Sequence, residues 1–514
     1  MNDFPLTMQH IFWRIEKLYS DSEIVSRSEE GIERKTYSEF ATRVRKFSSF
    51  LQSLKLSKGD RVASIEWNTR RHLELYFATI NMGYVLHTIN VRFHPNEIEY
   101  VINHANDRYA FISPEFESLT KNLKTSLNGI FLLDNNFDKV IDMQKPINEF
   151  PQIDERDEAI MCYTSGTTGR SKGVVYTHRT IYLHSLTLLA KDAIGISRKD
   201  SVLVVVPMFH INGWDLPFSA LMTGSKLVLP GPRPKPKDLA ELIEKEKVTI
   251  AAGAPTVWID FLNFIEKENY DISSLKIVVT GGAEPPKIIA EKFNKMGVHL
   301  YHAWGMTETE AITTVNQNQE MISSQGIPLP GIEIKLMGLD REEELPWDSK
   351  SIGELWVSGA WIAKEYYKEI EKTRETFKLI NSRTWMRTGD IVTINNKGYI
   401  KIVDRAKDLI KSGGEWISSI DLENAITGYY KVFEAAVVGV KDEKWGERPI
   451  ALVKPKKEYE GNITENEIKQ YLLSLNKFPR WWIPDKIIFV DEIPKTSTGK
   501  LDKKVIREML KNII

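Results

Sequence analysis

A short polar segment, Tyr163–Gly173, has the composition of a binding loop for a phosphate chain. It reads YTSGTTGRSKG and lies between apolar runs at 159–162 and 174–175, which are expected to be strands. Glycines let backbone N–H groups approach an anion, hydroxyls can donate hydrogen bonds to it, and Arg170 and Lys172 can neutralise its charge. The segment lacks the Gly-x-x-x-x-Gly-Lys-Ser/Thr spacing of a Walker loop, and on its own it fits a flexible surface turn equally well.

The segments around this loop predict an α/β fold. Residues 37–54 and 238–247 carry apolar side chains at helical spacing. Apolar runs typical of buried strands occur at 201–207, 226–230, 248–253 and 275–282. Because helical patterns alternate with these strands, much of the sheet should be parallel. From about residue 353 the predicted strands become shorter.

Bulk composition narrows the class of protein. A chain of 514 residues is expected to form two or more domains, and its 42% hydrophobic and 27% charged content is typical of a globular enzyme. The net charge of −1 argues against nucleic acid as a general partner. The single cysteine, Cys162, excludes a disulfide framework. Without a signal-peptide pattern or an apolar run of roughly 18 residues, the expected location is cytoplasmic with no transmembrane segment. The oligomeric state is left open, with a homo-oligomer as one alternative.

Further motifs follow the loop in a fixed order. They are MFHING at 208–213, YHAWGMTE at 301–308, GELWVSG at 353–359, RTGD at 387–390, VDRAKDLIKSGGE at 403–415 and PKTSTGK at 494–500. Together with the loop, these motifs resemble those of the AMP-forming adenylate synthetases, a superfamily that includes acyl-CoA synthetases. Within it the chain is most similar to the medium-chain fatty acyl-CoA ligases, through HTINVRFHPNEI, FHINGWDLPF, KSGGEWISSIDLENA and KWGERP.

The resemblance implies a fold and a reaction. The fold is α/β, with an N-terminal AMP-binding domain at 1–403 made of parallel and mixed sheets, helices and a distorted β-barrel subdomain. A small α+β domain at 404–514 would rotate about a hinge at Lys407, although Asp404 stands where many members have glycine. The implied activity is ATP-dependent carboxylic acid:CoA ligation through an acyl-adenylate, with release of pyrophosphate and AMP. ATP, Mg²⁺ and coenzyme A are the implied cofactors and co-substrates.

The resemblance also assigns residues to the nucleotide. The β- and γ-phosphates would be held by Thr164, Ser165, Gly166, Thr167, Thr168, Gly169 and Lys172. Thr307 would hold the α-phosphate and Glu308 the Mg²⁺, with Thr164 as a further metal ligand, because a hard cation prefers oxygen. The adenine would stack on Trp304, with Gly281, Gly282, Ala283, His302, Ala303, Gly305 and Met306 around it. Asp390 would accept the ribose hydroxyls, and Arg405 would bind the ribose and phosphate region.

The last two motifs would serve the two halves of the reaction. Lys500 would stabilise charge during adenylation, whereas Lys503 and Lys504 are expected to be solvated. Rotation about Lys407 would withdraw Lys500 and bring in the residues that serve CoA, which are Lys411, Gly413, Gly414, Glu415, Trp416 and Trp445. His210 would gate the acyl entrance, whereas His178, His184 and Cys162 are expected to be structural.

Acyl length is predicted from the residue after Trp304. Acetyl-CoA synthetases of this superfamily have a second tryptophan there, whereas this chain has Gly305, so a longer acid should enter. Trp214, Val257 and Trp258 would form the pocket floor and limit the substrate to short- and medium-chain fatty acids. As an alternative, Asp215 would face the pocket and favour a hydroxylated short acid such as a hydroxybutyrate. A non-CoA acceptor and a non-catalytic nucleotide-binding protein are further alternatives.

Overall fold

The computed structural model describes residues 3–28, 30–120, 123–164, 170–413, 415–495 and 501–510. The chain divides into two compact units, which are described separately. The first unit contains the described residues up to Glu333 together with Val357–Met386, and the second contains Ile334–Trp356 and the described residues from Arg387 onward. The boundary predicted between residues 403 and 404 stays a prediction.

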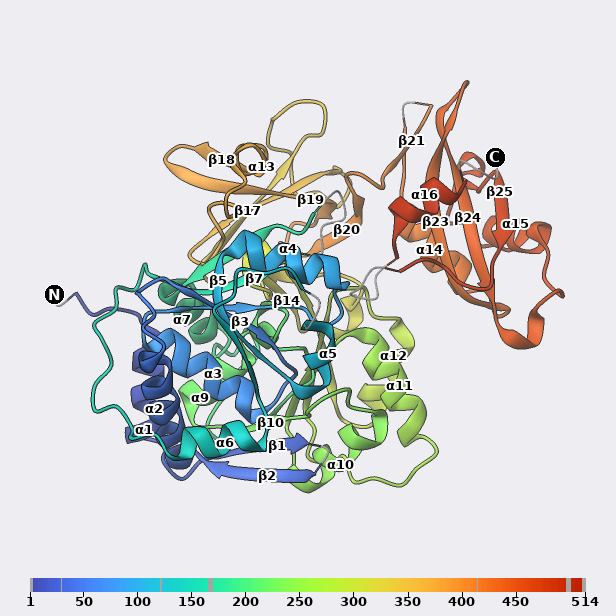
Figure 1. Cartoon of the computed structure of the whole chain (residues 1–514). Helices are drawn as coiled ribbons and strands as arrows, with labels where there is room; N and C mark the ends of the chain where they lie inside the picture. The colour runs from blue at the N-terminus through green and yellow to red at the C-terminus, as the bar shows by residue number, and fades with distance from the viewer. Residues whose placement is uncertain are drawn as a thin grey trace. The chain divides into compact units, whose positions relative to one another are not determined.

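A mixed sheet in the first unit has the strand order β15-β14-β13-β12-β11-β9-β10-β1-β2. Figure 1 labels β1, β2, β10 and β14 of this sheet. The strands are β1 Glu23–Ser28, β2 Gly31–Thr36, β9 Ser201–Val204, β10 Lys226–Leu229, β11 Ile250–Gly253, β12 Ile277–Gly281, β13 His299–Trp304, β14 Thr314–Asn316 and β15 Ile327–Pro328. The central pairs from β1 to β13 are parallel, and β2, β14 and β15 add antiparallel edges. The predicted parallel sheet is confirmed.

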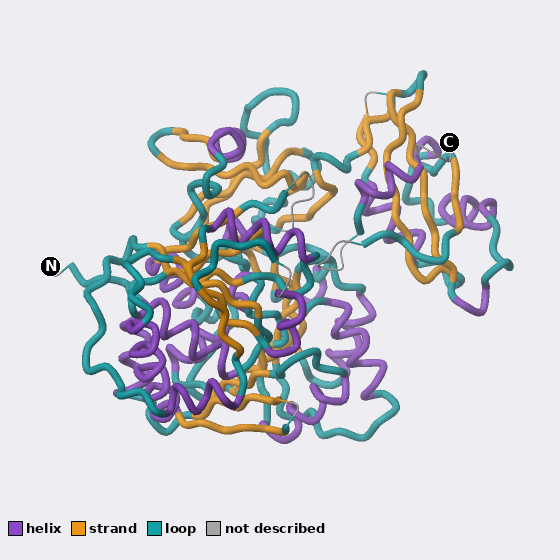
Figure 2. Tube along the Cα trace, viewed as in Figure 1, coloured by secondary structure: helices purple, strands orange, loops and turns teal. Residues whose placement is uncertain are grey.

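Helices cover this sheet because each has one apolar face. α10 Pro236–Glu246, α11 Pro255–Ile265 and α12 Lys287–Lys295 bury Leu242, Phe261 and Phe293 in one core cluster with strand residues such as Val278. α8 Ile211–Trp214 and α9 Leu216–Thr223 follow β9, and α1 Met8–Lys17 and α7 His178–Thr187 also belong to the first unit. Figure 2 shows these helices around the strands.

A second sheet in the same unit has the order β6-β5-β3-β4-β7-β8. Its strands are β3 Arg61–Ile65, β4 Val85–Thr88, β5 Asp107–Ile112, β6 Gly129–Leu132, β7 Glu158–Tyr163 and β8 Gly173–Thr177, with helices α2 Tyr37–Ser53, α3 Arg70–Asn81, α4 Pro95–Ala105 and α6 Asn135–Asp142. The predicted helix at 37–54 is confirmed as α2, and a capping box of Thr36 and Glu39 starts it. β7 and β8 form an antiparallel hairpin, so the polar loop lies between strands, as predicted.

A third sheet has the order β16-β17-β19-β18, with β20 beside β19. It consists of β16 Ile332–Met337, β17 Gly353–Gly359, β18 Phe377–Ile380, β19 Arg383–Ile394 and β20 Ile400–Arg405, and α13 Ile370–Thr376 precedes β18. The β19–β20 register shifts between Ile391 and Val392. Such a shift distorts a sheet locally, in agreement with the predicted distorted subdomain.

The last part of the second unit is α+β, as predicted. Its sheet has the order β22-β21-β24-β23, with β25 parallel to β24. The elements are β21 Ile410–Ser412, β22 Glu415–Ile417, β23 Val432–Asp442, β24 Gly446–Pro455, β25 Lys486–Phe489, α14 Ser419–Thr427, α15 Glu465–Ser474 and α16 Lys503–Leu510. Alternate β23 residues point to opposite faces, so Val437 joins a cluster with α14 and α15 and Val438 joins one with α16. Rotation of this region stays a prediction.

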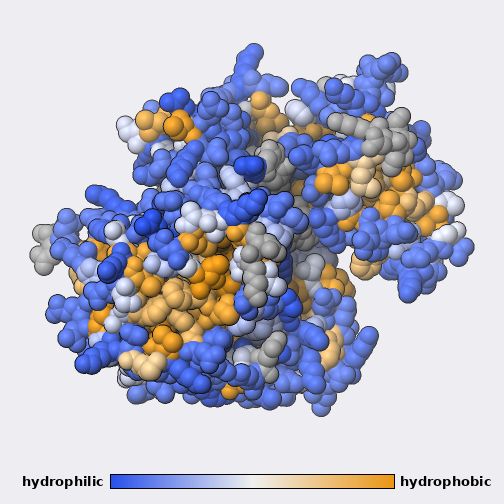
Figure 3. Space-filling view, in the orientation of Figure 1, coloured by the Kyte–Doolittle hydropathy of each residue, from blue (hydrophilic) through white to orange (hydrophobic). Residues whose placement is uncertain are grey.

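Most of the molecular face in Figure 3 is hydrophilic, and its apolar side chains gather in limited patches. Within the described part of the chain, no helix has both the length and the apolar character needed to cross a membrane. The cytoplasmic location stays a prediction.

Candidate active site

Motif residues from distant parts of the first unit meet at the carboxyl ends of neighbouring parallel strands. β9, β11, β12 and β13 lie side by side, and Gly281 at the end of β12 pairs with Ala303 near the end of β13. The chain then continues into His210–Asp215 beyond β9 and into Gly305–Glu308 beyond β13. The crevice at the carboxyl ends of parallel strands is where α/β sheets bind ligands. The topology therefore brings two predicted motifs and the predicted adenine-binding residue Gly281 to one binding edge.

The described ends of the polar loop are held together at the base of the β7–β8 hairpin. The Thr164 N–H donates to the Lys172 carbonyl at 2.9 Å, and the Lys172 N–H donates to the Thr164 hydroxyl at 3.3 Å. The predicted phosphate ligands Ser165, Gly166, Thr167, Thr168 and Gly169 lie outside the described residues. Burial, together with repulsion from Lys372, lowers the pKa of Lys172. Among the described residues Lys172 has no ion-pair partner, so its position fits an anionic ligand.

Glu308 is fixed by a residue that no motif predicted. It lies in the 3₁₀ turn Thr307–Thr309, and the Tyr366 hydroxyl donates to its Oε1 at 2.5 Å. The Lys172 ammonium lies 5.4 Å from the centre of the Tyr366 ring. Burial and the negative charge of Glu308 raise the pKa of Tyr366, which keeps its hydroxyl protonated as a donor. A carboxylate, a lysine and a hydroxyl at one place suit Mg²⁺ and phosphate oxygens.

Thr307 is positioned through its backbone. The Tyr176 hydroxyl of β8 donates to the Thr307 carbonyl at 2.7 Å, and the Ala363 N–H donates to the Glu308 carbonyl at 2.8 Å. The hairpin that carries the polar loop therefore also holds the turn of Thr307 and Glu308. Tyr176 and Tyr366 are far from this turn in sequence, and no local pattern marks them as its partners.

His302, which the resemblance assigns to the adenine surroundings, has its ring inside the core. The His302 ring is buried and its Nδ1 lies 3.0 Å from the Ile322 carbonyl. Burial lowers the pKa of His302 to about 4, so the ring is neutral at pH 7. The His302 side chain therefore supports the β13 edge from within the core. Trp304 is also largely buried, whereas Gly282 and Ala283 are exposed beyond β12.

Gly305 is required by close packing of the backbone. A Cβ atom at this position would lie 1.1 Å from the Ala311 carbonyl oxygen. No side chain fits there without rearrangement of the turn that carries Met306, Thr307 and Glu308. A Gly305→Trp variant would therefore disturb this turn instead of testing the acyl pocket alone.

The predicted floor of the acyl pocket needs one correction. Trp258 is fully buried, donates its indole N–H to the Gly253 carbonyl at 3.0 Å and packs edge-on against Phe261 and Phe293. It belongs to the core under α11 because its helix turns this side chain toward α12. Trp214 is partly buried, and its ring lies 3.2 Å from where a Cβ on Gly281 would be. Trp214 thus lies beside the carboxyl end of β12.

Asp215 is not available as a pocket residue in this arrangement. It is fully buried, with Oδ2 2.8 Å from His184 Nδ1 and Oδ1 3.0 Å from Asn212 Nδ2. Both carboxylate oxygens are occupied inside the protein. The alternative of a hydroxylated short acid therefore loses the residue on which it was based.

In the second unit, the predicted ribose residues form an ion pair. Asp390 of β19 pairs with Arg405 of β20, and Arg405 Nε lies 2.5 Å from Asp390 Oδ1. Glu354 of the GELWVSG motif holds this region, because its carboxylate accepts from Arg387 at 2.8 Å and from the Gly389 N–H at 3.2 Å. The sequence did not reveal that these two motifs act as one structural element.

The residues predicted to serve CoA gather at the β21–β22 hairpin. Lys411 pairs with Trp416 across the hairpin, and its ammonium lies 4.8 Å from the centre of the indole ring. The Gly413 N–H donates to the Trp445 carbonyl at 2.7 Å, and Glu415 begins the returning strand. Gly414 lies outside the described residues. Trp416 also lines a cavity of about 440 Å³ within this unit.

Lys500, the predicted adenylation residue, lies outside the described residues. The expectation that Lys503 is solvated is wrong, because its ammonium is buried 2.8 Å from Glu423 and 2.5 Å from the Ser419 hydroxyl. Ile506 and Leu510 pack against the sheet, and this orientation of α16 turns Lys503 inward. Burial raises the pKa of Glu423 to about 7, and the positive charge of Lys503 opposes that rise.

The helix that follows the Lys500 motif also contacts the predicted hinge. Arg507 donates to the Lys407 carbonyl at 3.0 Å and to the Asp408 carboxylate at 2.6 Å. Asp404 accepts from the Ser419 N–H at 2.6 Å at the start of α14. Asp404 therefore anchors this helix to β20.

Two family matches divide the motifs between them. Residues 12–367 match the AMP-binding enzyme family, and residues 421–500 match the AMP-binding enzyme C-terminal domain. The chain belongs to the AMP-binding enzyme family.

Characterised relatives of this AMP-binding enzyme activate several acids. The chain is 40% identical to the long-chain-fatty-acid–CoA ligase of Thermus thermophilus, with 100% of this chain and 98% of the relative covered. It is 38% identical to the medium-chain-fatty-acid–CoA ligase of Ectopseudomonas oleovorans, with 96% and 94% covered. It is 36% identical to the 3-methylmercaptopropionyl-CoA ligase of Ruegeria pomeroyi, with 99% and 98% covered.

Solved structures agree with the fold. The crystal structure of ATP-bound MatB from Rhodopseudomonas palustris has a TM-score of 0.87 and 25% identity, and covers 99% of this chain and 100% of that chain. The protein is an AMP-forming acyl-CoA synthetase that uses a carboxylic acid, ATP and CoA, and its α/β fold with mixed sheets and a small C-terminal domain is the one predicted. Adenylate formation brings a carboxylate to a triphosphate, so charge neutralisation and positioning are its main requirements.

The described residues of the AMP-binding enzyme suit those requirements. Lys172 would bind phosphate oxygens, and Glu308, oriented by Tyr366, would hold Mg²⁺. When bound, Mg²⁺ reduces the negative charge of the phosphates. Two tyrosine hydroxyls and the Ala363 N–H hold the backbone turn at Thr307, which would position the α-phosphate.

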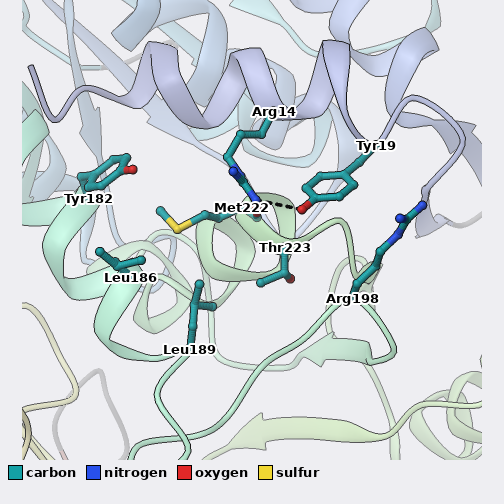
Figure 4. A pocket seen from close by; sticks show the side chains of 8 residues that line it. All are labelled: Arg14, Tyr19, Tyr182, Leu186, Leu189, Arg198, Met222 and Thr223. Atoms are coloured by element: carbon teal, nitrogen blue, oxygen red, sulfur yellow. Dashed lines mark hydrogen bonds between the residues drawn. The ribbon is translucent and has the colours of Figure 1, made fainter. Parts of the chain in front are cut away.

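A cavity elsewhere in the first unit is separate from these motifs. It has a volume of about 290 Å³, and Figure 4 shows its eight lining residues, which come from α1, α7, α9 and nearby loops. Arg14 donates to the Tyr19 hydroxyl at 2.8 Å and lies over the ring of Tyr19. None of the residues labelled in Figure 4 belongs to a nucleotide or CoA motif of the AMP-binding enzyme.

Proposed function

We propose that this acyl-CoA synthetase acts on short- and medium-chain fatty acids, with the acyl chain in the space between Gly305 and Trp214. The observation that carries the proposal is the packing of Gly305 against Ala311, which leaves no room for the indole wall of an acetate enzyme. Trp214, partly buried beside Gly281, supplies a closing wall and sets an upper limit on length. Two of the relatives named above act on medium-chain and long-chain fatty acids.

The proposed roles follow the predicted motifs. Thr164 and Lys172 bind the β- and γ-phosphates, Glu308 binds Mg²⁺, and Asp390 and Arg405 bind the ribose. Lys500 stabilises charge in the adenylation step. The hairpin of Lys411 and Trp416, with Trp445 beside it, receives the pantetheine arm of CoA for thioester formation.

Acyl length can be tested with straight-chain acids of two to twelve carbons. Each buried methylene contributes about 0.8 kcal/mol, roughly fourfold in kcat/KM, so selectivity should rise over several carbons before it falls. Trp214→Ala should move the optimum to longer acids, whereas Trp13→Ala, at an exposed tryptophan of α1, should leave the profile unchanged. A wild-type preference for acetate, or an unshifted optimum in Trp214→Ala, would contradict the proposal.

A further inference from the structure

The turn after β9 has an unusual backbone. Five consecutive residues, Ile211–Asp215, have φ between 45° and 64°, and only Gly213 among them is a glycine. Left-handed backbone is unfavourable for residues with a Cβ atom and persists only where surrounding contacts impose it. The contacts that impose it here are therefore informative, because this turn carries Trp214 and follows His210.

Buried side chains hold the turn from inside. Asn212 donates to Asp215 at 3.0 Å, and the Tyr76 hydroxyl donates to the Met208 carbonyl at 2.6 Å just before the turn. Asp215 in turn lies 2.8 Å from Nδ1 of His184, which belongs to α7. Asp215 and His184 are both fully buried. The Tyr76 hydroxyl also donates to Asn212 Oδ1 at 3.4 Å. The turn is thus fastened to α3 through Tyr76 and to α7 through the His184 imidazole.

The other ring nitrogen of His184 reaches the second binding segment. Nε2 lies 2.9 Å from the carbonyl of Ile312, four residues beyond Glu308. A carbonyl only accepts hydrogen bonds, so Nε2 carries a hydrogen. The contact between Nδ1 and Asp215 then contains one proton, which is bound either to the imidazole or to the carboxyl group. Glu310 and Ala311, which connect Glu308 to Ile312, also have left-handed φ values of 54° and 71°. Both ends of the bridge are therefore attached to backbone that needs an external tie.

We propose that His184 is a positioning residue of the adenylation step, which holds the Trp214 turn at a fixed distance from the Thr307–Glu308 turn. The inference rests on the proposed function, because it takes the Trp214 turn as the acyl side of the site. The bridge keeps the acid carboxylate aligned with the α-phosphate. Small misplacements of reacting groups typically cost about 10²-fold in rate, so loss of alignment should be measurable.

Two substitutions separate the two ends of the bridge. In His184→Asn, the side-chain amide nitrogen takes the position of Nδ1 and keeps the contact with Asp215. In His184→Gln, the side-chain amide nitrogen takes the position of Nε2 and keeps the contact with Ile312. If the bridge is the functional unit, each variant should lower kcat/KM for the acid in ATP–pyrophosphate exchange by about 10- to 100-fold. KM for ATP and the reaction of preformed acyl-adenylate with CoA should stay within about twofold.

A matched control distinguishes positioning from general destabilisation. His178→Asn changes another fully buried histidine of the same helix, one that contacts the Met8 N–H instead of the active site. It should leave exchange kinetics unchanged even if the thermal midpoint falls. Three results would overturn the inference. The His184 variants could lose kcat/KM equally for the acid and for ATP, they could show unchanged exchange kinetics, or His178→Asn could show the same loss as they do. Failure of the proposed function would appear differently, as an absent or acetate-centred acid profile in the wild-type enzyme.

Discussion

At the scale of single residues, Tyr366 makes the contact with the clearest expected effect on the proposed Mg²⁺ site. Its hydroxyl donates to a carboxylate that is 7% exposed, and no other described side chain donates a hydrogen bond to that carboxylate. Partners of this kind orient metal ligands, and their loss typically lowers metal affinity about 10- to 100-fold. The Glu308 carboxylate should therefore be less well oriented for Mg²⁺ without Tyr366.

Tyr366→Phe tests this role. The variant should fold normally but require about 10-fold more Mg²⁺ for half-maximal ATP–pyrophosphate exchange, because Glu308 is no longer held in one orientation. A Mg²⁺ titration measures the effect. Tyr367→Phe is the matched control, since the Tyr367 ring contacts Arg61 and His104 instead of Glu308. An unchanged Mg²⁺ requirement in Tyr366→Phe would contradict the role.

His178 gives a prediction about pH and stability. Its Nδ1 accepts from the Met8 N–H at 3.3 Å, and burial lowers its pKa to about 4. In the unfolded chain the imidazole of His178 has a pKa near 6.5. Between pH 6.5 and 4 the unfolded state therefore binds more protons than the folded state, and the free energy of unfolding decreases as the pH is lowered. His178 alone contributes roughly 3 kcal/mol to this loss.

His178→Asn keeps an acceptor for Met8 but cannot titrate. Urea unfolding between pH 7 and 4.5 should therefore show a smaller loss of stability in the variant than in the wild type. The exposed His299→Gln is the control and should retain the wild-type slope. Identical slopes in all three proteins would mean that His178 titrates normally in the folded state.

Motifs identify which residues gather, but they do not fix where each side chain points. Motif positions predicted four residues that the structure brings together in pairs. Lys172 and Glu308 meet at Tyr366 in the first unit, and Asp390 and Arg405 form an ion pair in the second. Trp258 and Lys503 were misassigned because their orientation depends on packing partners from other elements, and the place of His302 beside adenine stays a prediction. Tyr366 was missed because it is 58 residues from Glu308.

At the scale of elements, the β21–β22 hairpin is shaped by one glycine. Gly413 has φ of 62°, and a Cβ atom there would lie 3.0 Å from the Trp445 ring. The packing of a tryptophan from a later loop against this hairpin could not be predicted, because no local sequence pattern marks the two segments as partners.

Gly413→Ala should impair thioester formation more than adenylation. The added methyl group meets Trp445 and strains the hairpin, so the reaction of preformed acyl-adenylate with CoA should slow by about 10-fold or more. ATP–pyrophosphate exchange should change little. Gly461→Ala is the matched control, because Gly461 has φ of 75° with nothing within 4 Å of the added atom. Equal losses in both half-reactions, or in both variants, would reject this role for the hairpin.

At the scale of the whole molecule, the sequence predicted two domains joined near residue 404, and the structure has two compact units that exchange segments. The crossing of strands such as β17 between units could not be predicted, because alternation in a strand does not say which unit its ends join. The proposed hinge at Lys407 is in contact with α16 through Arg507. Movement at Lys407 would therefore involve the helix that directly follows the Lys500 motif.

Lys407→Pro tests whether this position is a hinge. Proline fixes φ near −65°, so the variant should keep one orientation of the C-terminal region. One half-reaction should survive near its wild-type rate while the other falls by at least about 10²-fold. Pyrophosphate exchange and thioester formation from preformed adenylate measure the two halves. Parallel loss of both, with a lowered thermal midpoint, would place the hinge elsewhere.

The pairing of β1 with β10 has a consequence for biosynthesis. Leu227 is made roughly 200 residues after its partner Ile24, which at about 5–20 residues per second takes about 10–40 s on the ribosome. Throughout that interval the β1–β2 hairpin presents an unpaired strand edge with Ile24 and Val25, which are buried in the finished protein. Codon choice between residues 28 and 226 therefore sets how long a nascent chain needs protection from aggregation.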